Sequence, residues 1–148
     1  MRILLAIDDS KFSEAAAQAV VAQARRPDTE VQVLHVIEPP TILVAREMGA
    51  YASAMEAEWQ KHRKQAEELV ANTAKMLREA GLKASTAVEQ GDPKSRILDL
   101  ATEWQADLIV LGSHGRKGLD RFLLGSVSEA VVRHAPCSVE IVRIRSGQ

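Results

Sequence analysis

The sequence is poor in cysteine and in aromatic residues, and it has no long apolar run. Its one cysteine, Cys137, has no partner for a disulfide within the chain. Aromatic residues make up 3% of the sequence, so the core has to be built from Ala, Val, Ile and Leu. Such a core suits a buried parallel sheet packed against alanine-rich helices. No apolar stretch approaches the roughly 20 residues that a membrane helix needs, and we expect no membrane span.

The sequence also lacks an excess of positive or negative charge. Lysine and arginine together number 19 and aspartate and glutamate 20, which gives a net charge of -1. A surface that binds a nucleic-acid backbone needs a basic excess, so we expect no nucleic-acid partner. No histidine pair stands with a cysteine at the spacing of a zinc site, and we expect no metal cage. The apolar run from Ile3 to Ile7 is too short for the core of a signal peptide, which favours a cytoplasmic protein.

Apolar runs alternate with helical segments along the chain. Short runs of apolar and β-branched residues predict strands at 2–8, 31–37, 82–89, 107–112 and 138–144. Between them, helices are predicted at 14–23, from about 51 to 80, at 93–104 and at 126–134. Gly81 is a natural stop after the long second helix, and Asp92 with Pro93 favours the start of the third.

This alternation predicts one α/β domain over residues 1–148, with an open parallel five-stranded sheet and helices on both faces. The first and fourth strands are the most apolar and should be central, which corresponds to the Rossmann-like order 3-2-1-4-5. In such a sheet the strand order reverses between strands one and four. Ligands bind beyond the carboxyl ends of the strands at that point. Two polar loops follow these two strands, so we expect the site there.

The loop after the fourth predicted strand has the composition of a phosphate site. It runs from Gly112 to Ser126 and contains three further glycines, which let a backbone approach a ligand closely. Arg116, Lys117 and Arg121 add local positive charge. The start of the helix that follows favours an anion, because its N–H groups point outward. The loop matches neither a Walker A sequence nor G-x-G-x-x-G.

The spacing of the loop glycines resembles the ATP-binding signature of the universal stress protein family, G-x2-G-x9-G-S/T. Every position of that signature is present, as Gly112, Gly115, Gly125 and Ser126. The resemblance covers essentially the whole chain. Residues 3–10 are similar to the family's first strand with its aspartate, and residues 134–143 are similar to its last strand.

The resemblance implies that the chain binds ATP, with or without Mg²⁺, and it implies which residues form the site. Asp8 matches the first-strand aspartate that lies beside the adenine and ribose, and Val36 matches an apolar residue that contacts adenine. Ala6 and Ile7 flank Asp8 and would line the base pocket. The phosphates would lie against the loop and the first turn of the next helix, at Gly112, His114, Gly115, Arg116, Lys117, Gly125, Ser126, Val127 and Ser128.

The resemblance also implies a homodimer, because members of the family usually dimerise through the last strand, here Ser138 to Ile144. An exposed edge strand that pairs across a two-fold axis is consistent with this. Glu140 departs from the family pattern, since that strand is often apolar throughout. Its carboxylate either faces solvent or weakens the dimer.

Some of these residues also have simpler explanations. Ser126 and Glu129 have the spacing of a capping box with Ser126 as the N-cap, and a capping hydroxyl can also face a phosphate. A residue next to Asp8, either Asp9 or Ser10, is predicted to cap the first helix, which leaves Asp8 for the ligand. A lone loop histidine is more often a surface residue than a catalyst.

Three functions are compatible with these patterns. The first is a regulatory module that binds ATP with slow or no hydrolysis, since the loop carries no evident catalytic apparatus. The second is a slow Mg²⁺-dependent ATPase or a phosphotransferase, including one that phosphorylates itself, in which Asp8 holds the metal and His114 meets the γ-phosphate. The third is a nucleotide-free dimeric protein that acts through its partners.

Overall fold

The computed structural model describes residues 1–23, 27–39, 52–115 and 123–145. Each predicted strand and helix is present, and the ends lie within about three residues of the predicted ones. In chain order the elements are β1 (Arg2–Ala6), α1 (Lys11–Gln23), β2 (Glu30–Ile37), α3 (Ala52–Glu79), β3 (Lys83–Gln90), α4 (Pro93–Glu103), β4 (Leu108–Gly112), α5 (Ser126–His134) and β5 (Ser138–Val142). Among the described helices, none is long and apolar enough to cross a membrane.

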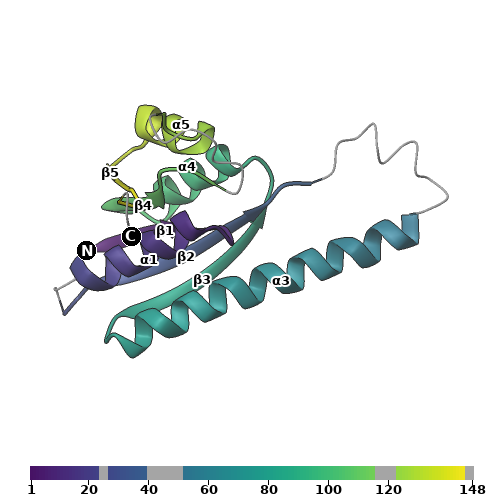
Figure 1. Ribbon diagram of the computed structural model, residues 1–148, viewed down its shortest axis with the longest axis horizontal. Coiled ribbons are helices and arrows are strands. Elements are labelled where there is room, and N and C mark those ends of the chain that lie inside the picture. Colours follow the sequence, from purple (N-terminus) through teal and green to yellow (C-terminus); the bar gives the residue numbers. More distant parts are fainter. Residues whose placement is uncertain (24–26, 40–51, 116–122, 146–148) are drawn as a thin grey trace.

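The strands form one parallel sheet in the order β3-β2-β1-β4-β5 (Figure 1), so the predicted topology is confirmed. β1 is central: Leu4 lies between Gln32 of β2 and Ile109 of β4. The chain therefore leaves β1 toward one side of the sheet and returns to β4 on the other. The carboxyl ends of β1 and β4 lie side by side at this reversal, which is where ligands of such sheets bind.

Each face of the sheet is covered by its own pair of helices, because successive strand residues point to opposite faces. On one face, Leu5 and Val110 pack with Val20 of α1 and Leu77 of α3. On the other, Leu4, Leu34 and Ile109 pack with Ile97 of α4 and Val131 of α5. The core is aliphatic on both faces, as the low aromatic content predicts.

The helix α3 is much longer than the strand it covers. Its 28 residues span about 42 Å at 1.5 Å per residue, whereas β3 with 8 residues spans about 26 Å. Its buried residues in the core, Val70, Ala74 and Leu77, all lie in the carboxyl-terminal half. The amino-terminal half projects beyond the sheet (Figure 1).

The two edge strands differ. On the β3 edge, the Arg78 side chain donates two hydrogen bonds to the carbonyl oxygen of Ala84, from Nε at 3.1 Å and from Nη2 at 2.7 Å. A long charged side chain that occupies a backbone acceptor makes an edge strand harder to extend. The opposite edge is β5, and its residues Val139, Glu140, Ile141 and Val142 are half-buried.

Candidate functional site at the carboxyl edge of the sheet

The carboxylate of Asp8, directly after β1, is held by the start of α1. Its Oδ1 accepts hydrogen bonds from the backbone N–H of Ser10 and from the hydroxyl of Ser13, each at 2.9 Å. The Ser13 Oγ accepts in turn from the Asp8 N–H at 2.8 Å. Ser10 is the N-cap, since its Oγ lies 3.2 Å from the Ser13 nitrogen and its carbonyl accepts from Glu14. A cap from Asp9 or Ser10 was predicted, and Ser10 provides it; Asp8, which was expected to be left for the ligand, is bonded to the helix start as well.

Two of the loop glycines lie so close to other residues that a side chain in their place would force a neighbouring atom to move. A Cβ on Gly115 would lie 3.0 Å from Oδ2 of Asp8. A Cβ on Gly112 would lie 2.7 Å from the Cβ of Phe12 and 2.8 Å from its backbone carbonyl. The end of β4 therefore lies directly on the first turn of α1. This brings Gly112, Gly115 and Asp8 together, as the sequence predicted.

The two ends of the loop are joined by hydrogen bonds. The N–H of Gly125 donates to the carbonyl of Ser113 at 2.8 Å. The buried Ser128 hydroxyl donates to the carbonyl of Gly112, also at 2.8 Å. These bonds hold the start of α5 beside the end of β4, so the predicted phosphate residues on either side of the loop are adjacent. Arg116 and Lys117 lie outside the described residues.

The start of α5 differs from the predicted capping box. Gly125, with φ -63° and ψ 160°, is the N-cap, and its carbonyl accepts from the Glu129 N–H at 2.9 Å. Ser126 is therefore the first helical residue, and the prediction that it caps the helix was wrong. Glu129 instead pairs with Arg133 at 2.9 Å. Because the N-cap is a glycine, no described side chain accepts a hydrogen bond at this helix start.

The His114 side chain is buried, with 8% of its surface exposed, which differs from the expectation of a surface loop residue. Its ring lies against the ring of Phe12, with centroids 5.3 Å apart, and its Nδ1 lies 3.1 Å from the Ser113 hydroxyl. Its Nε2 is buried without a hydrogen-bond partner in the described part of the chain. A buried polar atom of this kind is a group that a ligand or a water would satisfy.

The predicted base pocket is brought together only in part. Ala6 and Val36 each pack against the core cluster on the face of the sheet that α4 and α5 cover, and so does Val127, which was predicted to lie at the phosphates. Ile7 does not join them, because its side chain points to the opposite face and is buried against α1 and α3. Its backbone is also engaged: its carbonyl lies 2.7 Å from Nδ1 of His35, and its N–H donates to Leu34.

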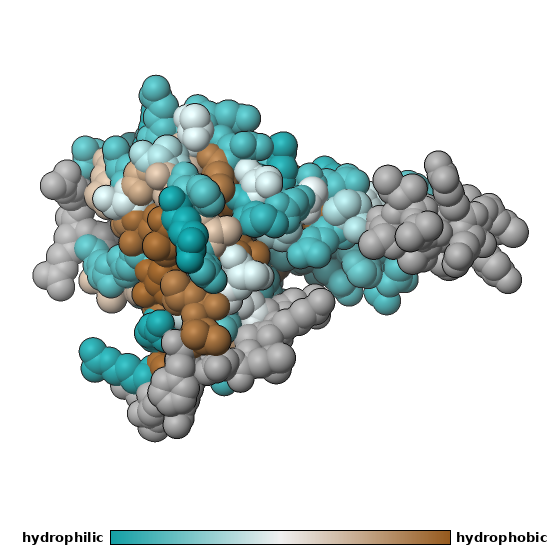
Figure 2. Space-filling view, turned by 90° about the horizontal axis from the view of Figure 1, so that it is seen from above, coloured by the Kyte–Doolittle hydropathy of each residue, from teal (hydrophilic) through white to brown (hydrophobic). Residues whose placement is uncertain are grey.

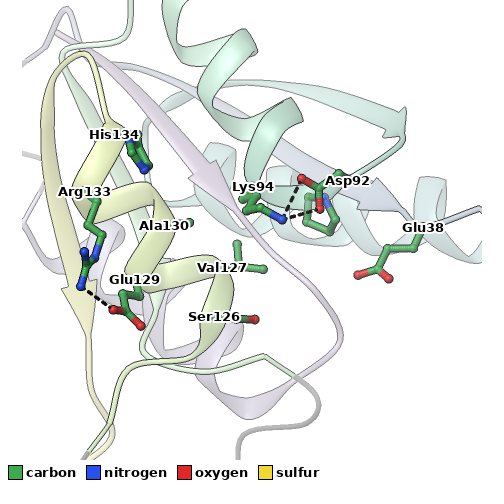
Figure 3. A pocket seen from close by; sticks show the side chains of 10 residues that line it. Glu38, Asp92, Lys94, Ser126, Val127, Glu129, Ala130, Arg133 and His134 are labelled. Carbon is green, nitrogen blue, oxygen red and sulfur yellow. Dashed lines mark hydrogen bonds and ion pairs between the residues drawn. The ribbon is translucent and has the colours of Figure 1, made fainter.

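A groove with a volume of about 380 Å³ adjoins these residues between α4 and α5 (Figure 3). It shares Ser126 and Val127 with the predicted phosphate site. Four of its charged residues form two ion pairs, Lys94 with Asp92 at 3.1 Å and Arg133 with Glu129. A hydrogen bond from the Ser95 hydroxyl lowers the pKa of the Asp92 carboxyl. The full lining is Glu38, Asp92, Pro93, Lys94, Ser126, Val127, Glu129, Ala130, Arg133 and His134.

Sequence reasoning missed Phe12, Ser13 and most of this groove. Ser13 could have been found, since a hydroxyl at the third position of a helix that starts just after a strand lies near the end of that strand. The contact of Phe12 with Gly112 and the meeting of α4 with α5 join distant parts of the chain, and no local pattern signals them. 

The model of the universal stress protein family matches residues 1–143. A putative universal stress protein of Staphylococcus aureus (strain USA300) is 38% identical over 143 residues, which cover 95% of this chain and 82% of that protein. Among solved structures, the hypothetical protein MJ0577 is 29% identical with a TM-score of 0.84, over 99% of this chain and 97% of that one. Universal stress protein UspA from Lactobacillus plantarum is also 29% identical, with a TM-score of 0.67 and 97% of each chain covered.

A more distant solved structure carries a ligand. A universal stress protein family protein from Arabidopsis thaliana, solved with AMP bound, is 19% identical with a TM-score of 0.70, over 99% of this chain and 93% of that one. At this identity the likeness concerns the fold. All of these similarities extend over nearly the whole chain.

Proposed function

The chain belongs to the universal stress protein family, and from this premise we propose that it binds ATP at the carboxyl edge of its sheet. We propose further that it acts as a regulatory module of the stress response, with slow or no hydrolysis. The phosphates lie at the start of α5 and the loop before it. The base lies toward Ala6, Val36 and Val127.

The observation that carries this proposal is the way α5 begins. Its N-cap is a glycine, and no described side chain accepts a hydrogen bond there. The hydrogen bonds to Ser113 and Gly112 hold this helix start against the residues after β4. The N–H groups of a first turn, together with about half a unit of positive charge from the helix dipole, favour a phosphate. An N-cap hydroxyl or carboxylate would compete for those groups, and glycine has neither.

The other groups of the site fit a nucleotide. Asp8 is oriented by Ser10 and Ser13, and its Oδ2 faces Gly115, so it can accept from a ribose hydroxyl or hold Mg²⁺. The buried Nε2 of His114 supplies a further polar group without a partner in the described chain. Ala6, Val36 and Val127 supply an apolar wall for the base. Arg116 and Lys117 are proposed as phosphate-binding cations from their position in the loop.

An adenine nucleotide is the ligand class that related structures favour. Besides the AMP-bound Arabidopsis protein, a universal stress protein solved in complex with cAMP has this fold, at 21% identity and a TM-score of 0.63. We propose slow or no hydrolysis because the two candidate bases among the described groups are already engaged: the Asp8 carboxylate is bonded to α1 through Oδ1, and the His114 imidazole is buried against Phe12 with its Nδ1 beside the Ser113 hydroxyl. Neither is therefore well placed to take a proton from an attacking water molecule.

The test is to identify the nucleotide that the protein carries. Freshly purified protein is denatured, and the released small molecules are separated by chromatography and weighed by mass spectrometry. The matched control is Gly115→Asp, which brings a second carboxylate toward Asp8, where a Cβ alone already lies 3.0 Å from Oδ2. We expect ATP from the natural protein and none from the variant, with the same far-ultraviolet circular dichroism for both. Release of ADP alone would favour a slow ATPase.

An empty protein that also fails to bind ATP in calorimetric titration would contradict the proposal. In that case an interaction protein without nucleotide would be the better description. Mg²⁺-dependent phosphate release at about 10 per second, an ordinary enzyme rate, would contradict the regulatory assignment while leaving nucleotide binding intact.

We also propose that two copies pair through β5. Val139 and Ile141 pack inward against the cluster under α4 and α5, and among the described strands β5 pairs with β4 alone. The other edge strand, β3, has a carbonyl occupied by Arg78. Dimerisation should therefore protect the outward-facing amides of β5 from hydrogen exchange as protein concentration rises, while β3 stays constant. Protection of β5 that does not change with concentration would oppose a β5 dimer.

A further inference from the structure

The projecting half of α3 is a second surface with no assigned role. We call residues 52–65 of this helix the arm. Among the described side chains of α3 the first buried one is that of Ala66, and from residue 54 to 65 all side chains are exposed except those of Met55 and Trp59, which are half-buried. Figure 1 shows the arm extending past the sheet, and in the space-filling view of Figure 2 this part projects from the rest of the molecule. A free helix of this length is marginally stable in water, so the arm depends on the packed half of α3.

One face of the arm carries apolar, acidic and basic side chains in a regular order along the helix. Met55, Glu56, Trp59, His62 and Arg63 recur at the three- and four-residue spacing that places side chains on one side of a helix. Trp59 is at the centre, with the acidic residue one turn before it and the basic residues one turn after it. The opposite side carries Ala57, Lys61 and Lys64.

We propose that this face pairs with the same face of a second copy, with the two arms antiparallel about a two-fold axis at Trp59. Each tryptophan then packs on that of the second copy. Glu56 lies opposite Arg63 of the second copy, twice by symmetry, and Met55 lies opposite His62. The acidic residue precedes the basic residue along the arm. Two arms therefore match in charge only when they run antiparallel, because parallel arms would place Glu56 beside Glu56. This charge pattern argues for a second copy rather than another protein.

The present partners of these charges do not oppose the pairing. Arg63 Nε lies 3.4 Å from Glu67 Oε1, and both side chains are about half exposed, at 47% and 58%. His62 Nε2 lies 2.9 Å from Glu58, again with both side chains exposed, at 53% and 61%. Exposed pairs of this kind are weak, so Arg63 can bind a second carboxylate when one is brought near. The Trp59 ring adds a surface over which an arginine can lie.

The arm pairing is separate from the nucleotide site and from β5. The arm extends from the β3 side of the sheet, whereas β5 is the opposite edge. If both contacts form, assemblies larger than a dimer appear, and loss of the arm contact removes one association step. A failure of ATP binding would leave the arm pairing untouched.

The experiment is a charge exchange followed by sedimentation velocity over a range of protein concentrations. Glu56→Arg and Arg63→Glu are made singly and together, and Lys61→Glu on the opposite side of the helix is the control with the same change of charge as Arg63→Glu. We expect each single variant to weaken one association step about tenfold, because two symmetric attractions become repulsions. The double variant should restore it, and Lys61→Glu should leave it unchanged.

Cross-linking provides a second measurement. In a Cys137→Ser background, which removes the one natural cysteine, Trp59→Cys should form a disulfide-linked dimer on mild oxidation. Ala57→Cys, on the opposite side of the helix, should form it much more slowly. Circular dichroism confirms that each variant folds. A natural chain without the extra association step, a double variant that is not restored, or equal cross-linking at both positions would overturn the proposal.

Discussion

The Oγ of Ser128 donates a hydrogen bond of 2.8 Å to the carbonyl oxygen of Gly112, sixteen residues earlier in the chain. Ser128 is buried, with 3% of its surface exposed. This bond joins the first turn of α5 to the last residue of β4. It thereby holds the start of α5 against the end of β4.

Replacing Ser128 with alanine should reduce stability. The Ser128→Ala variant removes this donor from a buried carbonyl, and the expected loss is about 1–3 kcal/mol in the free energy of unfolding. Urea denaturation measures it. The exposed Ser126 hydroxyl, two residues away, is the matched control, and Ser126→Ala should change stability by about 0.5 kcal/mol at most. Equal losses in the two variants would show that the Ser128 bond is not a support of the loop.

Gly112→Ala should be more harmful than a single methyl group suggests. Its Cβ would meet the Cβ of Phe12 at 2.7 Å and the backbone of Phe12 at 2.8 Å. Since the backbone of α1 cannot move aside freely, the expected destabilisation is about 1–3 kcal/mol, seen as a lower melting temperature. Gly125→Ala is the comparison, because its closest contact, to the Cα of His114, is longer at 3.3 Å. A melting temperature of Gly112→Ala at or above that of Gly125→Ala would contradict this packing argument.

Two variants can separate the structural role of Asp8 from its proposed role in ligand binding. Asp8→Asn keeps an oxygen that can accept from Ser10 and Ser13, so its stability should stay within about 1 kcal/mol of the natural protein. Asp8→Ala loses that acceptor and should lose about 1–2 kcal/mol. ATP affinity, measured by calorimetry, should fall in both variants if the carboxylate binds ribose or Mg²⁺. Full affinity in Asp8→Asn would exclude a need for the negative charge.

The thiol of Cys137 should react slowly in the folded protein. Burial raises the pKa of this thiol above its ordinary value, and Asp107 raises it further. A raised pKa means less thiolate at pH 8, and the thiolate is the reactive form. Labelling with a chromogenic disulfide should therefore be slower than in urea-unfolded protein, and the folded rate should still be rising above pH 8.5. Because folding favours the neutral thiol, its contribution to stability is fully present below the unfolded pKa and is lost as pH rises through the folded pKa. Equal folded and unfolded labelling rates would contradict a thiol that folding partly buries.

The order and type of the elements were predictable because each is signalled locally. Strand β1 is an apolar run, and Gly81, with φ 91°, ends the turn after α3 as predicted. Asp92 and Pro93 do begin α4, although the Asp92 carboxylate bonds the Ser95 hydroxyl rather than a backbone N–H. Signals of this kind act between residues that are close in sequence, and long-range packing in this protein does not override them.

The errors arise where distant residues meet. Ser126 has the sequence of an N-cap, but Gly125, whose N–H donates to Ser113, takes that position, and the N-cap lies one residue earlier than predicted. Ile7 was grouped with Ala6 because they are neighbours in sequence, yet neighbours in an extended chain point to opposite faces. The burial of His114 depends on Phe12, which lies on another element. The sequence predicted that the ends of the loop lie beside Asp8 at the carboxyl edge of the sheet, whereas the individual contacts there depend on packing.

The side chain of Arg78 has a consequence for how far sheets of this protein can grow. Strand pairing between copies needs a free edge on each copy, and a molecule with two free edges can join an endless ribbon. Here Arg78 occupies a carbonyl of β3, so growth through that edge is hindered. If two copies pair through β5 as proposed, that contact uses the more accessible edge of each copy, and further growth of the combined ten-stranded sheet into a fibre is hindered at β3.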